Sequence, residues 1–395
     1  MITFLEEANR IKDELITIRR DLHEHPELGF EEKRTSEKIK EFLTKEGIPY
    51  VEVAKTGVCG IIKGEKEDNN IVIGLRADMD ALPIQDKKVC SYSSKVPGKM
   101  HACGHDAHTT ILLGVARILN KNKRLFGGCV KLFFEPAEET VGGAPFMIKE
   151  GVLENPRVDA IVGLHVTEDL DYGKIRIKSG VVNAASNPYK IKIKGRGGHG
   201  AAPHTTIDPI VIASNVVMAL QTIVSREIAP VNPSVITVGS INGGTAQNVI
   251  PEEVEITGII RTLTKEDREY VVRRFKELVT GICRGMRGEC DIYIEEGYPC
   301  LYNNATMVER VKYVGKELLG VENVVEQKHP SMGVESFAFF AMERTSAFYY
   351  LGTGNRTKGT DKAAHSNLFD IDEDAIPLGV AMQCGIAYDL SLIHI

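Results

Sequence analysis

The sequence predicts an α/β protein, a mostly parallel sheet with helices on both faces, interrupted by an inserted α+β domain. Short apolar segments alternate with helix-periodic segments early in the chain and again near its end, as in strand–helix–strand units. Between them, strands with alternating polar and apolar residues indicate a sheet with one exposed face. The 395 residues are also too many for one ordinary domain.

The α/β part is predicted from four apolar strands and one amphipathic helix. The helix covers 105–119, with apolar residues on one face. The strands are NIVIGLRADMD (70–80), GCVKLFFEPAEE (128–139, stopped by Pro136), DAIVGLHV (159–166) and SAFYYLGTG (346–354). Together they predict a discontinuous domain formed by residues 1–183 and 298–395.

The middle of the chain, 184–297, follows the order β-α-β-β-α-β. This is the split pattern of ferredoxin-like domains. The predicted elements are a strand at 189–200, a helix at 209–227, strands at 234–241 and 252–263, a helix at 265–285 and a strand at 290–299. The apolar stretch 210–224 is too short and too polar to span a bilayer, so we expect a buried helix and no membrane contact.

Composition narrows the class of protein. The formal net charge is −6, and no basic run indicates a nucleic-acid partner. The first residues are charged and helix-periodic, unlike a secretory signal. Eight cysteines without a repeated spacing indicate reduced thiols, and hence a cytoplasmic protein.

The last six residues, LSLIHI, match what a common sequencing adaptor encodes, so His394 is not considered as a candidate site residue.

Side chains suited to metal binding follow several predicted strands. Asp78 and Asp80 follow one strand, Glu138 and Glu139 the next, and His165 a third. The string HACGHDAH (101–108) precedes a helix. Because ligands bind at the carboxyl ends of parallel strands, we expect these segments to meet at one edge of the sheet.

Within HACGHDAH, Cys103 and His105 flank Gly104, which lets the backbone bend so that both side chains can face one ion. A thiolate with an imidazole suits zinc or another late first-row metal. A buried thiol beside a helix capped by Asp106 is an equally good interpretation of this string alone. His101 and His108 are better explained as structural or supporting residues.

The remaining candidate site residues indicate a metal site only when they are considered together. Adjacent acids such as Glu138 and Glu139 are usually solvated, but beside a metal one can coordinate while the other takes a proton from water. His165 alone would be a core histidine. By spacing alone, His365 and His199 would be a surface loop residue and a solvated turn.

Strings along nearly the whole chain resemble the peptidase M20 metallohydrolases, in particular the N-acyl-amino-acid amidohydrolases that include hippurate and auxin-conjugate hydrolases. The matching strings are RRDLHEHPELGFEE (19–32), RADMDALP (76–83), MHACGHDAHTTILLG (100–114), FFEPAEE (133–139), GLHV (163–166), GRGGHGAAP (195–203), TAQNVIPEEVEITGIIRT (245–262), GVESFAFF (333–340) and HSNLFDIDE (365–373). One departure is Asp78-Met79-Asp80, where many relatives have His-x-Asp; the acylase branch carries this form and uses the cysteine.

The resemblance implies a metal-dependent hydrolase that releases a carboxylic acid and an amino acid from an N-acyl amino acid. Metal-activated water would attack the amide, Glu138 would be the general base, and Asp80 would orient a ligand. His199 would contact the substrate carbonyl, and Asn248 and Arg261 the substrate carboxylate. Two divalent ions (Mn, Zn, Co or Ni) would be held by Cys103, His105, Glu139, His165 and His365.

The resemblance leaves three alternative functions open, as well as the question of a homodimer. An N-acetyl-diaminopimelate deacetylase or a dipeptidase of the same family would use similar chemistry. A catalytically silent metal-binding protein would keep the ligands without turnover. The inserted domain could also pair two chains into a homodimer, as in many relatives.

Overall fold

The computed structural model describes residues 2–67 and 70–392, so His394 lies outside the described residues. The chain forms two compact units. The first comprises Met1–Gly180, Tyr302–His329 and Ser336–Ile395, and the second comprises Val181–Leu301 and Pro330–Glu335. The sequence placed the insertion at 184–297; the structure adds to the second unit a short later segment that returns from the first.

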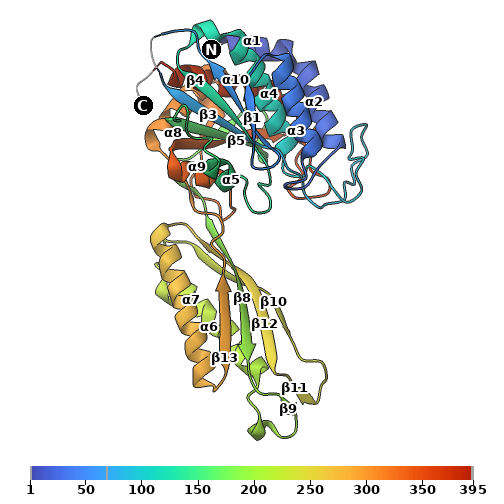
Figure 1. The fold of residues 1–395 in the computed structure, drawn as a ribbon, viewed down its shortest axis with the longest axis vertical. Coiled ribbons are helices and arrows are strands. Elements are labelled where there is room, and N and C mark those ends of the chain that lie inside the picture. The colour runs from blue at the N-terminus through green and yellow to red at the C-terminus, as the bar shows by residue number, and fades with distance from the viewer. Residues whose placement is uncertain (1, 68–69, 393–395) are drawn as a thin grey trace. The chain divides into compact units, whose positions relative to one another are not determined.

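The first unit contains an eight-stranded sheet in the order β1-β2-β4-β3-β5-β16-β6-β15 (Figure 1). Its strands are β1 (Tyr50–Val53), β2 (Gly57–Lys63), β3 (Val72–Asp78), β4 (Cys129–Glu135), β5 (Ala160–Asp171), β6 (Ile175–Ile177), β15 (Val324–Glu326) and β16 (Thr345–Gly354). The four strands predicted for this domain are its central neighbours β4, β3, β5 and β16, and they pair in parallel. Their carboxyl ends therefore meet at one edge.

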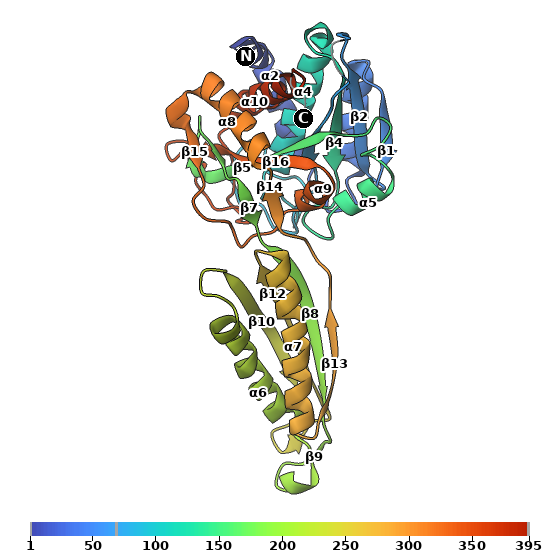
Figure 2. The same ribbon diagram turned by 90° about the vertical axis from the view of Figure 1, so that its left-hand side faces the viewer.

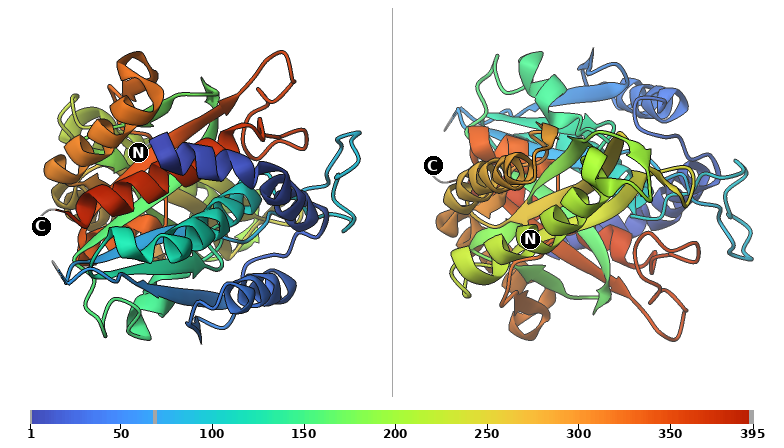
Figure 3. Two further views of the ribbon diagram at one scale, coloured as in Figure 1. Left: turned by 90° about the horizontal axis from the view of Figure 1, so that it is seen from above. Right: turned by 90° about the horizontal axis from the view of Figure 1, so that it is seen from below.

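Helices cover both faces of this sheet, which confirms the predicted fold class. One face carries α1 (Ile2–Arg10), α2 (Lys12–Glu24), α3 (Lys33–Lys45), α4 (His105–Lys121), α8 (Ala305–Leu319) and α10 (Ala375–Leu390). Figure 3 shows α10 between α1 and α4. The other face carries α5 (Ala144–Lys149) and α9 (Phe337–Glu343), where Phe340 stacks on Phe133 at 5.5 Å and Phe337 packs against Phe348 at 5.3 Å. Burial of these side chains keeps the strand ends in place.

The second unit is built on the antiparallel sheet β10-β12-β8-β13. Its elements are β8 (Ala185–Lys194), α6 (Pro209–Thr222), β10 (Ser234–Gly243), β12 (Glu253–Thr262), α7 (Lys265–Gly285) and β13 (Glu289–Ile294), with β9 (Gly198–His199) paired to β11 (Val249–Ile250). This order confirms the predicted β-α-β-β-α-β pattern. The sheet buries Ile191 and Ile193 beneath the helices, while Lys190 and Lys192 form ion pairs with acids of β12 on the open face. Two further strands, β7 (Gly180–Asn183) and β14 (Leu301–Asn303), pair near the start and end of this unit.

The helix at 210–224 was expected to be buried, which is wrong for one of its faces. Ile212 and Val216 are buried against the sheet, but Ile210, Val211 and Met218 are exposed, Met218 by 72%. By length and composition alone, Pro209–Glu227 would pass for a membrane-spanning helix, and a third of its most apolar window is buried in the protein. Its apolar outer face needs another explanation.

Gly163 lets β5 approach the phenylalanine layer closely. A Cβ added there would lie 2.6 Å from Phe348 Cδ2 and 2.9 Å from Phe337 Cδ2, whereas one added at Gly60 in β2 would meet only ordinary contacts from 3.4 Å. We expect Gly163→Ala to lower the free energy of unfolding by about 1–3 kcal/mol, because overpacking strains neighbouring side chains. Gly60→Ala serves as the matched control.

Urea unfolding of both variants, followed by the midpoint of the transition, measures this difference. Equal midpoints for the two variants would show that the aromatic layer relaxes without cost.

Candidate metal centre

All five predicted metal ligands come together at the carboxyl edge of the central strands. Cys103 and His105 lie at the start of α4, Glu139 follows β4, His165 lies within β5, and His365 belongs to the loop before α10. Possible ligand atoms fall within 4.8 Å of one another in the groups Cys103–His105–His165, Cys103–Glu139–His365 and His105–Glu138–Glu139. The groups share members, so together they outline one continuous centre.

The printed distances show how closely these atoms approach. Cys103 Sγ lies 3.4 Å from His165 Nε2. Glu139 Oε1 lies 3.3 Å from His365 Nε2 and 3.8 Å from His105 Nε2. Thiol, imidazole and carboxylate atoms thus face a common space, which is the donor set that late first-row divalent ions take.

The turn that carries the thiol depends on Gly104. Gly104 has φ +88°, and a Cβ there would lie 2.2 Å from Val166 Cγ2. Only glycine combines this left-handed backbone with so close an approach to β5. The turn directs Cys103 toward His165. Asp106 lies in the first turn of the helix, where its Oδ1 accepts the Ala107 N–H at 2.9 Å, and its buried carboxylate also binds Arg19 and His23.

The electrostatics of the centre favour a bound cation. Burial and the neighbouring Glu139 raise the pKa of the Cys103 thiol well above its usual value. Burial opposes charge on His105, yet Asp78, Asp80 and Cys103 raise its pKa, and Glu139 raises that of His365.

One oxygen of the carboxylate at the middle of the centre also lacks a hydrogen-bond partner among the described residues. Glu139 Oε1 is buried and accepts no hydrogen bond of good geometry, despite the two imidazoles near it. A divalent ion would satisfy this oxygen and allow the thiol to ionise. The residues present therefore fit a metal centre.

Asp80 orients two of the ligands at once. Its Oδ1 lies 3.1 Å from His105 Nδ1, so the other ring nitrogen, Nε2, faces Glu139. Its Oδ2 accepts a hydrogen bond from the Glu139 backbone N–H at 3.0 Å. Supporting contacts of this kind set the direction and basicity of metal ligands. The supporting role of Asp80 stays a prediction, for which these two contacts supply the geometry.

His108 is close to the centre but both its nitrogens are already used. Nδ1 lies 2.6 Å from Asp78 Oδ1, and Nε2 accepts the Val166 N–H at 2.8 Å. Burial lowers the pKa of His108 to about 4, so the ring is neutral and can accept that bond. Although Asp78, His105 and His108 are near enough to form a further ligand group, His108 instead supports the backbone beside His165.

Sequence reasoning missed the buried arginine beside these ligands. Arg76 Nη1 donates to Asp78 Oδ2 and its Nε donates to Glu135 Oε2, both at 2.6 Å. Arg76 Nη2 donates to Ser336 Oγ at 2.8 Å. The available signal was an arginine inside an otherwise apolar strand, VIGLRAD, because a charged residue there must have buried partners.

Three predicted substrate residues belong to the second unit, and they do not all lie together. The β9–β11 pair places exposed His199 beside Val249, next to Asn248, whose carbonyl accepts the Gly200 N–H at 2.8 Å. Arg261 is half-buried near the far end of β12, eight residues beyond Glu253, which is roughly 26 Å along a strand. One small ligand cannot contact both groups of a single chain.

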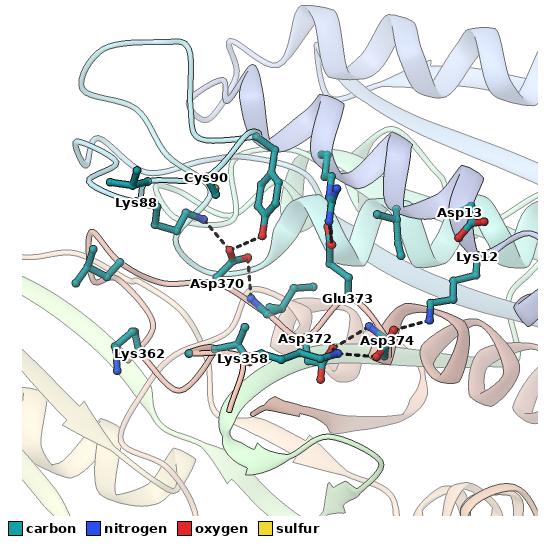
Figure 4. A pocket seen from close by; sticks show the side chains of 18 residues that line it. Lys12, Asp13, Lys88, Cys90, Lys358, Lys362, Asp370, Asp372, Glu373 and Asp374 are labelled. Carbon is teal, nitrogen blue, oxygen red and sulfur yellow. Dashed lines mark hydrogen bonds and ion pairs between the residues drawn. The ribbon is translucent and has the colours of Figure 1, made fainter. Parts of the chain in front are cut away.

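A separate pocket in the first unit lacks the features of this centre. Its volume is about 700 Å³, and Figure 4 shows most of its charged side chains joined in opposite pairs, such as Lys88 with Asp370 and Lys12 with Asp374, whereas Asp13 and Lys362 are joined to none of the residues drawn. None of the predicted metal ligands lines it. Because five basic and five acidic side chains line it, it offers no excess charge for a ligand.

We expect Asp80→Ala to weaken metal affinity about 10- to 100-fold, because the imidazole of His105 and the backbone of Glu139 lose their common anchor. Competition with a chromogenic chelator measures the affinity. Asp171→Ala, at an exposed carboxylate paired with Lys174, is the matched control. Equal affinities for the two variants would remove Asp80 from its orienting role.

Known proteins resemble this chain over most of its length. The model of the peptidase family M20/M25/M40 matches residues 74–389. The Arabidopsis thaliana protein named IAA-amino acid hydrolase ILR1-like 4 is 40% identical over 97% of this chain and 87% of its own length. The N-acetylcysteine deacetylase of Bacillus subtilis is 38% identical over 92% of this chain and 93% of its own length.

A solved structure agrees with the fold. The YXEP protein of Bacillus subtilis, described as a dinuclear metal binding peptidase from the M20 family, superposes with a TM-score of 0.83 at 33% identity, covering 97% of this chain and 99% of that one. Sequence, fold and a converged set of metal-type side chains agree, and the chain belongs to the peptidase family M20/M25/M40 as a metal-dependent hydrolase of amide bonds.

Proposed function

We propose that this protein hydrolyses the amide bond of N-acyl amino acids, releasing a carboxylic acid and a free amino acid. The observation that supports the proposal is that two adjacent carboxylates have different surroundings. Glu139 faces two imidazoles and the thiol, while Glu138 Oε1 accepts the Ser336 N–H at 3.0 Å. One acid is thus directed at the metal space and its neighbour is held beside it by the protein.

Each residue of the centre then has a separate role in the proposed reaction. Two divalent cations, held by Cys103, His105, Glu139, His165 and His365, would supply Lewis acidity that lowers the pKa of water and polarises the amide carbonyl. Glu138 takes the proton of the attacking water and returns it to the leaving amine. His199 donates to the developing oxyanion, an interaction typically worth about 3–4 kcal/mol. Manganese, zinc, cobalt and nickel all suit this mixed donor set.

The second candidate is deacetylation of an N-acetyl amino acid, such as N-acetyl-diaminopimelate. The likeness to an N-acetylcysteine deacetylase favours it, whereas the likeness to an IAA-amino acid hydrolase favours a larger acyl group. A dipeptidase would act on the same bond but with a free amine beside it.

A substrate panel separates these candidates. Metal-free protein reloaded with each of the four metals is assayed on N-acetyl, N-benzoyl and indole-acetyl amino acids and on free dipeptides. We expect hydrolysis of one or more N-acyl substrates to exceed that of dipeptides. Faster turnover of dipeptides would favour the peptidase, and full metal occupancy with no hydrolysis would favour a silent metal-binding protein.

The same assay tests the base. Glu138→Gln should retain the metal stoichiometry and lose at least about 100-fold in kcat, because the amide cannot accept the proton. Glu41→Gln, at an exposed site on α3, is the matched control. Near-normal turnover by the Glu138 variant would remove that residue as the base.

We also propose that the second unit pairs two chains through β10 and α6. In the described part of the unit, β10 has one sheet neighbour, β12, and Figure 2 shows α6 on the same side as β10. Exposed Val211 and Met218 on α6, with Val235 and Ile241 on β10, supply apolar area for a twofold contact. Pairing would also let Arg261 and Asn248, too far apart within one chain, serve one substrate from two chains.

Light scattering after size exclusion should show a dimer at micromolar concentration for the wild-type protein, and Met218→Glu should shift it toward monomer because a charge would be buried. Tyr293→Glu, at an exposed position on the opposite edge strand β13, should remain dimeric. A wild-type protein that is monomeric throughout would disprove the contact.

A further inference from the structure

Ser336 is the residue whose backbone contacts the proposed base. It is fully buried and lies directly before α9. Phe337 and Phe340, two aromatic residues of α9, pack against Phe348 and Phe133 of the sheet. Because this aromatic layer fixes the start of α9, the Ser336 N–H has a defined direction toward Glu138 Oε1.

The hydroxyl of Ser336 is held as firmly as its backbone. Oγ donates to Glu135 Oε1 at 2.6 Å and accepts from Arg76 Nη2 at 2.8 Å. Glu135 Oε1 also accepts the Ala144 N–H at 2.7 Å, and its Oε2 accepts from Arg76 Nε. Hydrogen bonds to buried charged groups are short and directional, so the serine has little freedom to rotate.

The same arginine reaches the metal side of the centre. Arg76 Nη1 binds Asp78, Asp78 Oδ1 pairs with His108, and His108 accepts the backbone N–H of Val166, the residue after His165. One guanidinium therefore connects the group that holds the base with the group that supports a metal ligand. The five rigid donors of arginine suit such a junction, which lysine could not replace.

We propose that Ser336 is a positioning residue that holds the Glu138 carboxylate at the angle needed for proton transfer, through an N–H fixed by the Arg76–Glu135 network. The inference rests on the proposed role of Glu138 as base. The serine itself does not touch the reacting atoms. Removal of its hydroxyl separates the Ser336 backbone from the Arg76–Glu135 network and loosens Glu138 while the metal ligands stay in place.

The test is Ser336→Ala in the metal-loaded protein, with Ser346→Ala as the matched control. Ser346 is a buried serine of β16 whose hydroxyl has no hydrogen-bond partner in the part of the chain that the structure describes. We expect Ser336→Ala to lower kcat about 10- to 100-fold, since a misplacement near 1 Å has that effect. KM and metal stoichiometry should stay close to the control values, and Ser336→Thr, which retains a hydroxyl, should recover part of the activity.

A double-mutant cycle with Glu138→Gln separates positioning from a general structural defect. If Ser336 acts through Glu138, Ser336→Ala should lower kcat in the wild type but hardly change the residual rate of the Glu138 variant. Equal losses in both backgrounds, or no loss relative to Ser346→Ala, would overturn the proposal.

The two proposals fail in different ways. Should Glu138→Gln itself stay active, the assignment of the base is wrong, whatever Ser336→Ala does. Should Glu138→Gln be inactive while Ser336→Ala is fully active, the base stands and only its positioning by Ser336 is refuted.

Discussion

The metal centre depends on how the charges of several buried carboxylates, close together at one edge of a parallel sheet, are compensated. Asp78, Asp80, Glu135 and Glu138 are each less than 10% exposed, and uncompensated charges at such depth would be very costly. Arg76 compensates Asp78 and Glu135 with fixed hydrogen bonds. Beside these acids, Glu139 lies close to the imidazole of His365 and the thiol of Cys103, a combination that divalent cations can neutralise.

A second buried arginine ties together the segments that carry the ligands. Arg19 of α2 is fully buried and contacts Asp106 Oδ2 and Asp370 Oδ1, each at 2.8 Å. Asp106 follows His105, and Asp370 lies in the loop that carries His365. Their carboxyl pKa values are held below the usual range against the effect of burial, chiefly by this guanidinium. The N-terminal string RRDLHEHP thus stabilises a centre to which it contributes no ligand.

The chain returns from the second unit to the first at the peptide bond between Glu335 and Ser336. The residue that binds Glu138 is therefore also the first residue of the returning segment. The roughly 26 Å between Arg261 and the His199 end of β12 also explains why one copy of that unit cannot supply every predicted substrate contact.

The sequence by itself determined the two-part architecture and the chemical type of the centre. Apolar strands ending in Asp80, Glu139 and His165 predict a shared edge, because parallel strands place their carboxyl ends together. Tertiary structure decided what strand periodicity does not encode: that His108 is bonded through both nitrogens, that α6 leaves an apolar face exposed, and that Ser336, some 200 residues beyond Glu138, holds its carboxylate. Such contacts join segments remote in sequence, and only packing of the whole chain brings them within hydrogen-bonding distance.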